Sequence, residues 1–129
     1  MHPLVLCVDD EHDMASLVRF LLMRAGCEVR IAHNGREALA AVQELLPDLI
    51  VLDLMLPDLD GFSVCEILRR EPATAAIPVV MLTAWSTPDA RAHGMAVGAR
   101  EYLTKPFRPY ELIARVQELL GQRGVDRAP

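Results

Sequence analysis

The sequence predicts an α/β fold in which a five-stranded parallel sheet is covered by helices on both faces. Unbroken runs of branched aliphatic residues, at 4–8, 49–52 and 79–82, are typical of strands that are buried on both sides. Segments with helical periodicity separate the runs, so that strand and helix alternate five times along the chain. A length of 129 residues is enough for one such domain and too short for a second folded unit.

Two strands and two helices account for the first part of the chain. After the strand at 4–8, apolar residues with helical spacing form a stripe that ends at Gly26, a residue type that commonly stops helices. The stripe consists of Met14, Leu17, Val18, Leu21, Leu22 and Ala25. Residues 28–32 alternate apolar and charged side chains, as a half-exposed edge strand does. A second helix is predicted over 35–45, with Asn34 placed to cap its first turn.

The alternation continues with the strand at 49–52 and a third helix. Asp60 and Gly61 mark the start of this helix, and it should end before Pro72. The next strand, at 79–82, is again a continuous apolar run.

The last part of the chain contains a weak helix, a short strand and a strong helix. Residues 88–97 have only a thin apolar stripe, which predicts light packing and easy movement. A short strand is expected around 101–103, followed by an amphipathic helix over 110–120. We assign residues 1–121 to the domain and residues 122–129 to a polar tail or the start of a linker.

Composition limits the partners and the location that we expect. The formal net charge of −5, without a cluster of lysine or arginine, argues against direct nucleic-acid binding by this segment. No apolar stretch is long enough to cross a bilayer and no secretory signal is visible, so we expect a cytoplasmic protein without membrane contact. The cysteines Cys7, Cys27 and Cys65 lack metal-binding spacing, so we expect reduced thiols.

Five polar residues each follow an apolar run, at the edge of the sheet where α/β proteins place functional side chains. They are Asp9, Asp10, Asp53, Thr83 and Lys105. The consecutive acids at 9–11 would repel one another unless a cation neutralised them. Oxygen ligands favour a hard divalent cation, Mg²⁺ or Mn²⁺. The alternative is that this acidic run only caps the helix that follows it.

The same residue types suit phosphoryl transfer to a carboxylate. We predict Asp53 as the phosphoacceptor, because it ends a central strand and a carboxylate can attack phosphorus when nearby charge is neutralised. Thr83 could donate to one phosphoryl oxygen and Lys105 could place a positive charge on another. A strand-end threonine also forms turns, and a lysine is commonly just solvated. A cis Lys105–Pro106 bond would aim the lysine over the sheet edge, but the sequence does not fix the isomer.

Over residues 3–120 the chain resembles the receiver domains of bacterial two-component response regulators. The matching stretches are VDDE at 8–11, DLIVLD at 48–53, LPDLDG at 56–61, LTA at 82–84, GA at 98–99 and YLTKPF at 102–107. Together they are highly specific. The stretch from Phe107 to Arg115 also resembles the last helix of receivers that are attached to winged-helix DNA-binding domains.

The resemblance implies a flavodoxin-like, doubly wound fold with strand order 2-1-3-4-5. It implies that Asp53 accepts a phosphoryl group from a histidine of a sensor kinase or a phosphotransfer protein, which makes the domain a signalling switch rather than an enzyme. Mg²⁺ would be bound directly by Asp10 and Asp53, through water by Asp9, and by the backbone carbonyl of Met55.

The resemblance also implies a switch and an output surface. Thr83 would move inward on phosphorylation, and Tyr102 would turn from solvent into the space that Thr83 vacates. The surface of the fourth helix, fifth strand and fifth helix would then pair two receivers. The candidate residues for this pairing are Arg91, Glu101, Glu111 and Arg115. Tyr102 is also an ordinary edge-strand aromatic, the charges also suit a solvated face, and Arg100 departs from the acid usual in that subfamily.

Two large apolar residues, Met55 and Trp85, lie two positions beyond Asp53 and Thr83. In receivers these positions tune the access of water, so we expect a long-lived phosphoryl group. An alternative role for Trp85 is to anchor a partner.

Three classes of function remain open on the sequence alone. The first is a phosphorylatable switch and the second is a receiver-like interaction module that is never phosphorylated. The third, an aspartyl-phosphate hydrolase, is weakened because Met55 stands where such enzymes need an acid. A flavin-binding flavodoxin is disfavoured because the first loop carries acids instead of phosphate donors. The sequence does not identify the kinase, the controlled process or an output domain.

Overall fold

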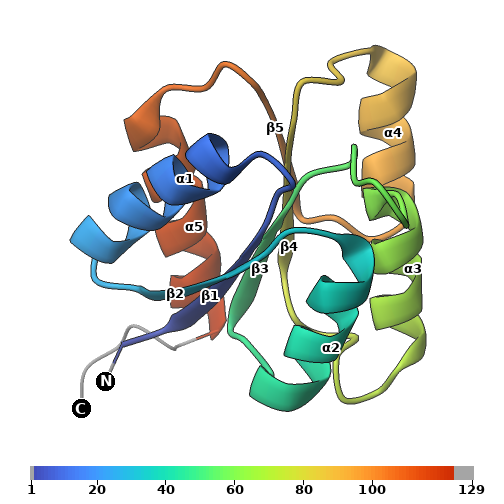
Figure 1. Ribbon diagram of the computed structural model, residues 1–129, viewed down its shortest axis with the longest axis horizontal. Coiled ribbons are helices and arrows are strands. Elements are labelled where there is room, and N and C mark those ends of the chain that lie inside the picture. Colours follow the sequence, from blue (N-terminus) through green and yellow to red (C-terminus); the bar gives the residue numbers. More distant parts are fainter. Residues whose placement is uncertain (1, 124–129) are drawn as a thin grey trace.

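The computed structural model describes residues 2–123 and contains the parallel sheet that the sequence predicts (Figure 1). Its strands are β1 (Leu4–Val8), β2 (Glu28–Ala32), β3 (Leu49–Leu52), β4 (Val79–Thr83) and β5 (Glu101–Thr104). They form one 5-stranded sheet in the order β2-β1-β3-β4-β5, which confirms the flavodoxin-like, doubly wound arrangement. The last two strands each extend one residue beyond the predicted run.

The helices of the described part lie in two layers. They are α1 (His12–Arg24), α2 (Gly35–Leu45), α3 (Gly61–Arg70), α4 (Pro88–Ala96) and α5 (Pro109–Arg123). Figure 1 shows α1 and α5 on one face of the sheet and the other three on the opposite face. Within β1, Val5 and Cys7 pack into the first layer, whereas Leu6 and Val8 pack into the second. Both faces are therefore buried, as the apolar runs predicted.

The last helix is longer than the sequence predicted. Helix α5 runs to Arg123, beyond the predicted domain end at residue 121. Residues 124–129 of the predicted tail lie outside the described residues, so the division into domain and tail stays a prediction.

Side chains cap the starts of α2, α3 and α4. The Asn34 side chain accepts a hydrogen bond from the amide of Glu37 at 2.8 Å, which confirms the cap of α2. Asp60 and Thr87 cap α3 and α4 in the same way. No helix among residues 2–123 is both long and apolar enough to span a bilayer.

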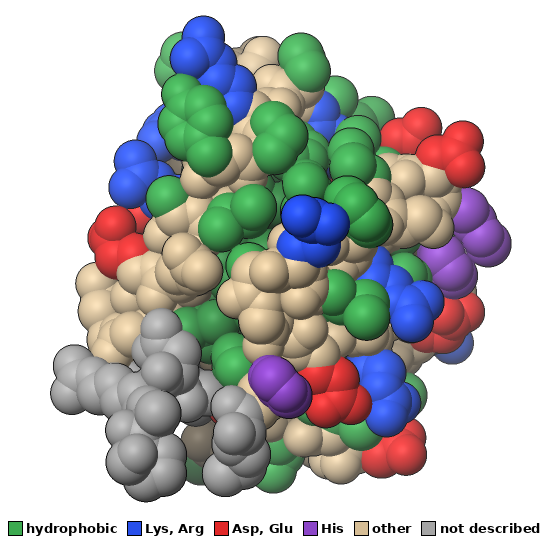
Figure 2. Space-filling view, turned by 90° about the vertical axis from the view of Figure 1, so that its left-hand side faces the viewer, with side chains coloured by type: hydrophobic (Ala, Val, Ile, Leu, Met, Phe, Trp, Pro, Cys, Tyr) green, Lys and Arg blue, Asp and Glu red, His purple; other side chains and the backbone are tan. Residues whose placement is uncertain are grey.

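The sequence predicted that Leu17 belongs to the buried stripe of α1. This prediction is wrong, because Leu17 is 43% exposed. The buried stripe consists of Ala15, Val18 and Leu22. This narrow stripe turns Leu17 outward together with Phe20 and Met23. Figure 2 faces this side of the molecule and shows apolar side chains at the surface among basic ones.

Helix α4 is as lightly packed as its thin stripe predicted, since it buries only Ala90 and Gly94 among its described side chains. A contact that the sequence did not indicate fixes the backbone beyond its last turn. The Arg69 guanidinium of α3 donates to the carbonyl of Gly98 at 2.7 Å, and to the carbonyls of Ala75 and Ile77. The turn after α4 is thus bound to α3.

Candidate functional site

The register of the sheet brings the predicted acids to one place. Val8 pairs with Leu52 between β1 and β3, so the residues that follow, Asp9 and Asp53, leave the sheet side by side. The amide of Asp53 donates to the carbonyl of Val8 at 3.0 Å, which extends this pairing past the ends of the strands. Parallel strands therefore deliver both carboxylates to the same carboxyl edge.

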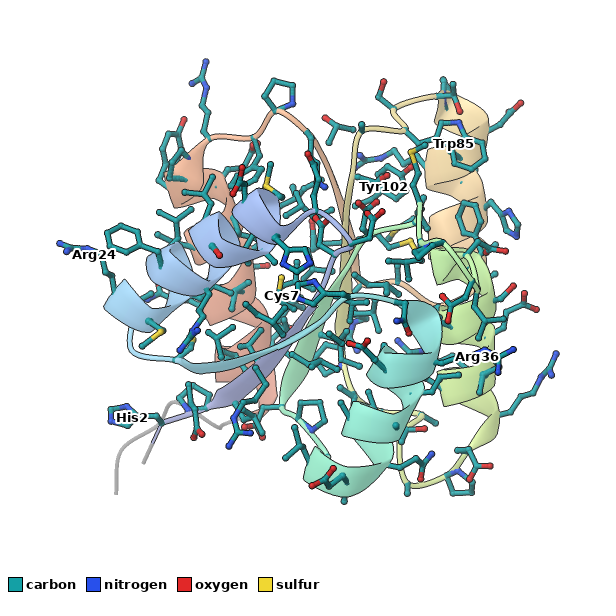
Figure 3. The ribbon with its side chains drawn as sticks, in the orientation of Figure 1. His2, Cys7, Arg24, Arg36, Trp85 and Tyr102 are labelled. Carbon is teal, nitrogen blue, oxygen red and sulfur yellow. The ribbon has the colours of Figure 1, made fainter. Side chains whose placement is uncertain are left out.

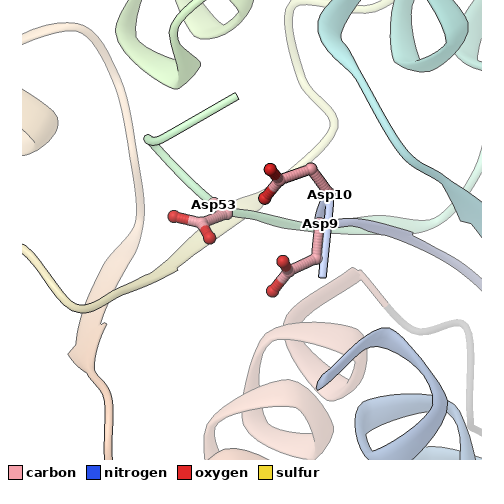
Figure 4. A group of neighbouring side chains, drawn as sticks. All are labelled: Asp9, Asp10 and Asp53. Atoms are coloured by element: carbon pink, nitrogen blue, oxygen red, sulfur yellow. The ribbon is translucent and has the colours of Figure 1, made fainter. Parts of the chain in front are cut away.

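Three carboxylates converge at this edge (Figure 4). Each of Asp9, Asp10 and Asp53 offers an oxygen that lies within 4.8 Å of the others. Asp9 and Asp53 are buried, whereas Asp10 is exposed. Such a set of oxygen donors, open to solvent on one side, fits a hard divalent cation that retains water ligands.

Lys105 completes the cluster from the end of β5. Its ammonium lies 2.7 Å from an oxygen of Asp9 and 3.0 Å from an oxygen of Asp53, and its side chain is only 11% exposed. Burial lowers the pKa of Lys105, but the hydrogen bonds and charges of the two acids outweigh it and leave the pKa raised. The Lys105–Pro106 bond is cis. The lysine is thus a partner of the predicted acids rather than a solvated side chain.

Backbone amides orient the two buried carboxylates. Asp9 accepts from the amide of Glu11 at 2.9 Å, and Asp53 accepts from the amide of Met55 at 3.1 Å. Glu11 is the N-cap residue of α1, yet its side chain makes no capping hydrogen bond. Simple helix capping therefore does not account for the acidic run. The role of the Met55 carbonyl as a metal ligand stays a prediction.

One positioning residue was missed by the sequence reasoning. Asp58, in the loop after β3, accepts from the amides of Gly35 and Arg36 at 2.7 and 3.0 Å. These amides begin α2, so the loop that carries Met55 is attached to a helix start. The sequence shows an acid in a turn and, separately, the first two backbone amides of a helix. No local pattern indicates that the acid accepts hydrogen bonds from these amides.

Thr83 and Tyr102 both contact the backbone of Trp85. The Thr83 hydroxyl accepts from the amide of Trp85 at 3.3 Å, and the Tyr102 hydroxyl donates to the carbonyl of the same residue. Tyr102 is only 1% exposed, so its ring already lies inside in this structure. The movement that the family resemblance implies, from solvent to the inside on phosphorylation, stays a prediction. Burial raises its pKa, Arg91 opposes this rise, and Asp53 adds to it. Figure 3 shows Trp85 and Tyr102 close to α4.

Met55 and Trp85 are both exposed. They line a groove of about 830 Å³ that also reaches Asp10. The ring of Trp85 contacts Phe62 edge to face, with ring centroids 5.8 Å apart. Their roles as a shield against water or as a partner anchor stay predictions.

The structure brings together all of the predicted output residues. Arg91, Glu101, Glu111 and Arg115 line one polar depression of about 190 Å³ beside β5. Arg115 lies 3.6 Å from Glu101. Arg100 points elsewhere, with its guanidinium 3.3 Å from the side-chain oxygen of Gln122. Whether these residues pair two copies of the chain stays a prediction.

The cysteines lie within the described residues and are buried as thiols, as the sequence led us to expect. Burial, and next the charge of Asp9, raises the pKa of Cys7 to about 12. Cys7 therefore packs under the site as a neutral side chain.

Comparisons with known proteins agree with this geometry. The family model described as the response regulator receiver domain matches residues 5–117. The chain is 47% identical over 127 residues to the DNA-binding dual master transcriptional regulator RpaA of Synechocystis, covering 98% of the chain and 52% of RpaA. It is 42% identical over 120 residues to the phosphate regulon transcriptional regulatory protein PhoB of Rhizobium meliloti, covering 93% of the chain and 53% of PhoB. The chain thus spans about half the length of these relatives.

Solved structures give the same result. A response regulator from Chloroflexus aurantiacus has a TM-score of 0.90 at 40% identity, covering 94% of this chain and 99% of that one. The chemotaxis response regulator CheY4 of Vibrio cholerae has a TM-score of 0.86 at 36% identity, covering 92% and 99%. With the family model matching most of the chain and the fold shared, this chain belongs to the receiver domains of the two-component response regulators.

Proposed function

We propose that this receiver accepts a phosphoryl group on Asp53 from a phosphohistidine of a sensor histidine kinase or a histidine phosphotransfer protein. One observation carries the proposal: Asp9 and Asp53 share the ammonium of Lys105, while Asp10 brings a third carboxylate within 4.8 Å on the solvent side. A structural salt bridge needs no third, exposed acid, whereas a site that binds both a cation and a phosphoryl group does.

The residues divide the chemistry between them. A carboxylate oxygen of Asp53 attacks phosphorus, and the bond from phosphorus to the imidazole nitrogen of the donor breaks as the new bond forms. Lys105 places its positive charge beside the acceptor. Because the Thr83 hydroxyl accepts from the amide of Trp85, its own proton is available for a phosphoryl oxygen.

The acids at 9, 10 and 53, with the Met55 carbonyl, would hold Mg²⁺ or Mn²⁺. When bound, this cation neutralises the carboxylates and the phosphoryl oxygens so that the anions can approach each other.

The phosphoryl group would act on the surface formed by α4, β5 and α5. It adds about −1.5 to −2 charges at the sheet edge, and Thr83 and Tyr102 connect this edge to the output residues. We propose that Arg91, Glu101, Glu111 and Arg115 pair two copies of the domain, because they line one depression. We also propose that the parent protein acts in the cytoplasm and binds DNA through another segment, because RpaA is named a DNA-binding regulator and this chain covers 52% of it.

Phosphorylation is tested by incubation with acetyl phosphate and Mg²⁺, with intact mass as the readout. We expect the wild-type chain to gain one phosphoryl group and Asp53→Asn to gain none. Asp13→Asn is the matched control, since Asp13 is exposed on α1 and should not affect labelling. Labelling of Asp53→Asn would refute the acceptor, and labelling that survives chelation of Mg²⁺ would refute the metal requirement.

The lifetime of the phosphoryl group tests the roles of Met55 and Trp85. We expect slow loss of phosphate from the labelled domain, and faster loss when both side chains are replaced by alanine. Hydrolysis of the wild-type phosphoprotein within seconds would contradict the shielding role.

A further inference from the structure

Helix α4 carries a glycine, Gly94, at a buried position where glycine weakens a helix. A Cβ atom added there would lie 2.9 Å from Cδ2 and 3.1 Å from Cε2 of Tyr102. It would also lie 2.8 Å from the sulfur of Met81. Contacts this short leave no room for a methyl group, so the absence of a side chain creates a slot on α4.

The ring of Tyr102 occupies this slot and is bound from several directions. Its hydroxyl donates to the carbonyl of Trp85. The guanidinium of Arg91, one turn before Gly94, lies 5.8 Å from the ring centroid and donates to the Tyr102 carbonyl at 3.0 Å. The sulfur of Met81 ends a flexible side chain and can shift, whereas the ring can yield to an added methyl group only by leaving these contacts.

We propose that Gly94 is a positioning residue that keeps the slot open for the inward ring of Tyr102 and thereby allows the switch to close. The slot itself depends only on packing, but its effect on signalling rests on the proposed function. The inward ring connects the carboxyl edge of the sheet, where Asp53 lies, to the surface of α4, β5 and α5. The connection runs through Trp85, whose backbone is hydrogen-bonded to both Thr83 and Tyr102. Arg91 extends this connection, since it binds Tyr102 and lines the depression beside β5.

The position of the ring can be measured directly, because the sequence has 2 tyrosines and Tyr110 is exposed. In a Tyr110→Phe background with 3-fluorotyrosine, Tyr102 is the only fluorinated residue of the chain, so the fluorine NMR signal reports on its ring alone. We expect a buried resonance in this parent, and a resonance at the solvent-exposed position after Gly94→Ala. Ala92→Gly is the matched control, because it changes helix propensity at an exposed site on α4 and should leave the resonance unchanged.

Stability gives a second readout. The sign of the change in urea midpoint on Gly94→Ala shows whether the Tyr102 ring fills the space beside Gly94. A glycine to alanine change in a helix normally raises the urea midpoint, because it restricts the unfolded chain. We expect Gly94→Ala to lower the midpoint when Tyr102 is present and to raise it in a Tyr102→Ala background, where the ring no longer fills the slot. The second background keeps the test valid if Gly94→Ala alone folds poorly.

A buried fluorine resonance and a higher urea midpoint in Gly94→Ala would overturn the inference. Neither readout requires phosphate, so a failure of the slot is distinguishable from a failure of Asp53 labelling. For signalling, we expect Gly94→Ala to take up one phosphoryl group from acetyl phosphate as wild type does, without return of the ring to the buried position. A ring that returns on phosphorylation would refute the proposed control of the switch.

Discussion

Replacement of Lys105 by methionine tests how the carboxylate cluster is held together. The change keeps a long apolar stem but leaves Asp9 and Asp53 without the ammonium that lies 2.7 and 3.0 Å from their oxygens. At an effective dielectric constant of about 20, each pair contributes about 5–6 kcal/mol of Coulomb attraction, much of which offsets lost hydration. Removal of one partner from a buried ion pair costs about 3–5 kcal/mol.

We expect the lower end of this range, a loss of about 3 kcal/mol in the free energy of unfolding, because the exposed side of the cluster admits water. Urea unfolding followed by circular dichroism measures the loss. Mg²⁺ binds only the folded cluster and therefore stabilises the protein. Excess Mg²⁺ should raise the stability of Lys105→Met more than that of wild type, because the acids of the variant have no ammonium partner. The control is Arg36→Met. The Arg36 side chain is 84% exposed and its Nε lies 3.9 Å from an oxygen of Asp58, so this change should cost less than about 1 kcal/mol.

A loss for Lys105→Met no greater than that for Arg36→Met would contradict a stabilising role of the Lys105 ammonium. Equal stabilisation of wild type and Lys105→Met by Mg²⁺ would also contradict this account, because the ammonium and the metal ion would then not act on the same two acids.

Three further predictions concern the contacts that hold the loops. Backbone hydrogen bonds outweigh the effect of burial and lower the pKa of Asp58 below its ordinary 3.8, so its stabilisation is complete above that pH and is lost at lower pH. The difference in urea midpoint between wild type and Asp58→Asn should therefore vanish as the solution is acidified through the lowered pKa; a constant difference would contradict this. Arg69→Met should cost about 3 kcal/mol and speed amide exchange in the turn after α4, whereas Arg70→Met should do neither. Asn34→Ala should cost about 1 kcal/mol in urea unfolding, because it removes the side-chain oxygen that accepts from the amide of Glu37; an unchanged midpoint would rule out a side-chain cap.

The strands and the site residues could be predicted because their signals are local. A run such as Leu49–Leu52 has no polar residue to place outside, so only a strand covered on both faces accommodates it. The acid that follows must then leave the sheet at its carboxyl edge, beside the acid that follows the neighbouring strand. The pairing of Lys105 with both acids follows from the same rule once all of the strands are parallel.

The details that escaped prediction depend on residues far apart in sequence. Helix α1 has apolar residues on several sides, and periodicity alone could not decide that Leu17 faces solvent while Ala15 is buried. The inward ring of Tyr102, in β5, packs against Gly94 of α4, a contact that no local pattern around either residue specifies. Asp58 reaches amides that begin α2, and no local pattern specifies such a contact.

The attachment of the turn after α4 has a mechanical consequence. Arg69 holds the Gly98 carbonyl, and the thiol of Cys65 donates to the Val97 carbonyl at 3.4 Å, so the distal end of the helix is anchored to α3. Its proximal end, capped by Thr87, follows the segment that contains Trp85. A displacement at the carboxyl edge of the sheet would therefore move the first turn of α4 most, because the other end of the helix is held by α3. A partner that distinguishes two states of the domain would do so best by binding the first turn of α4.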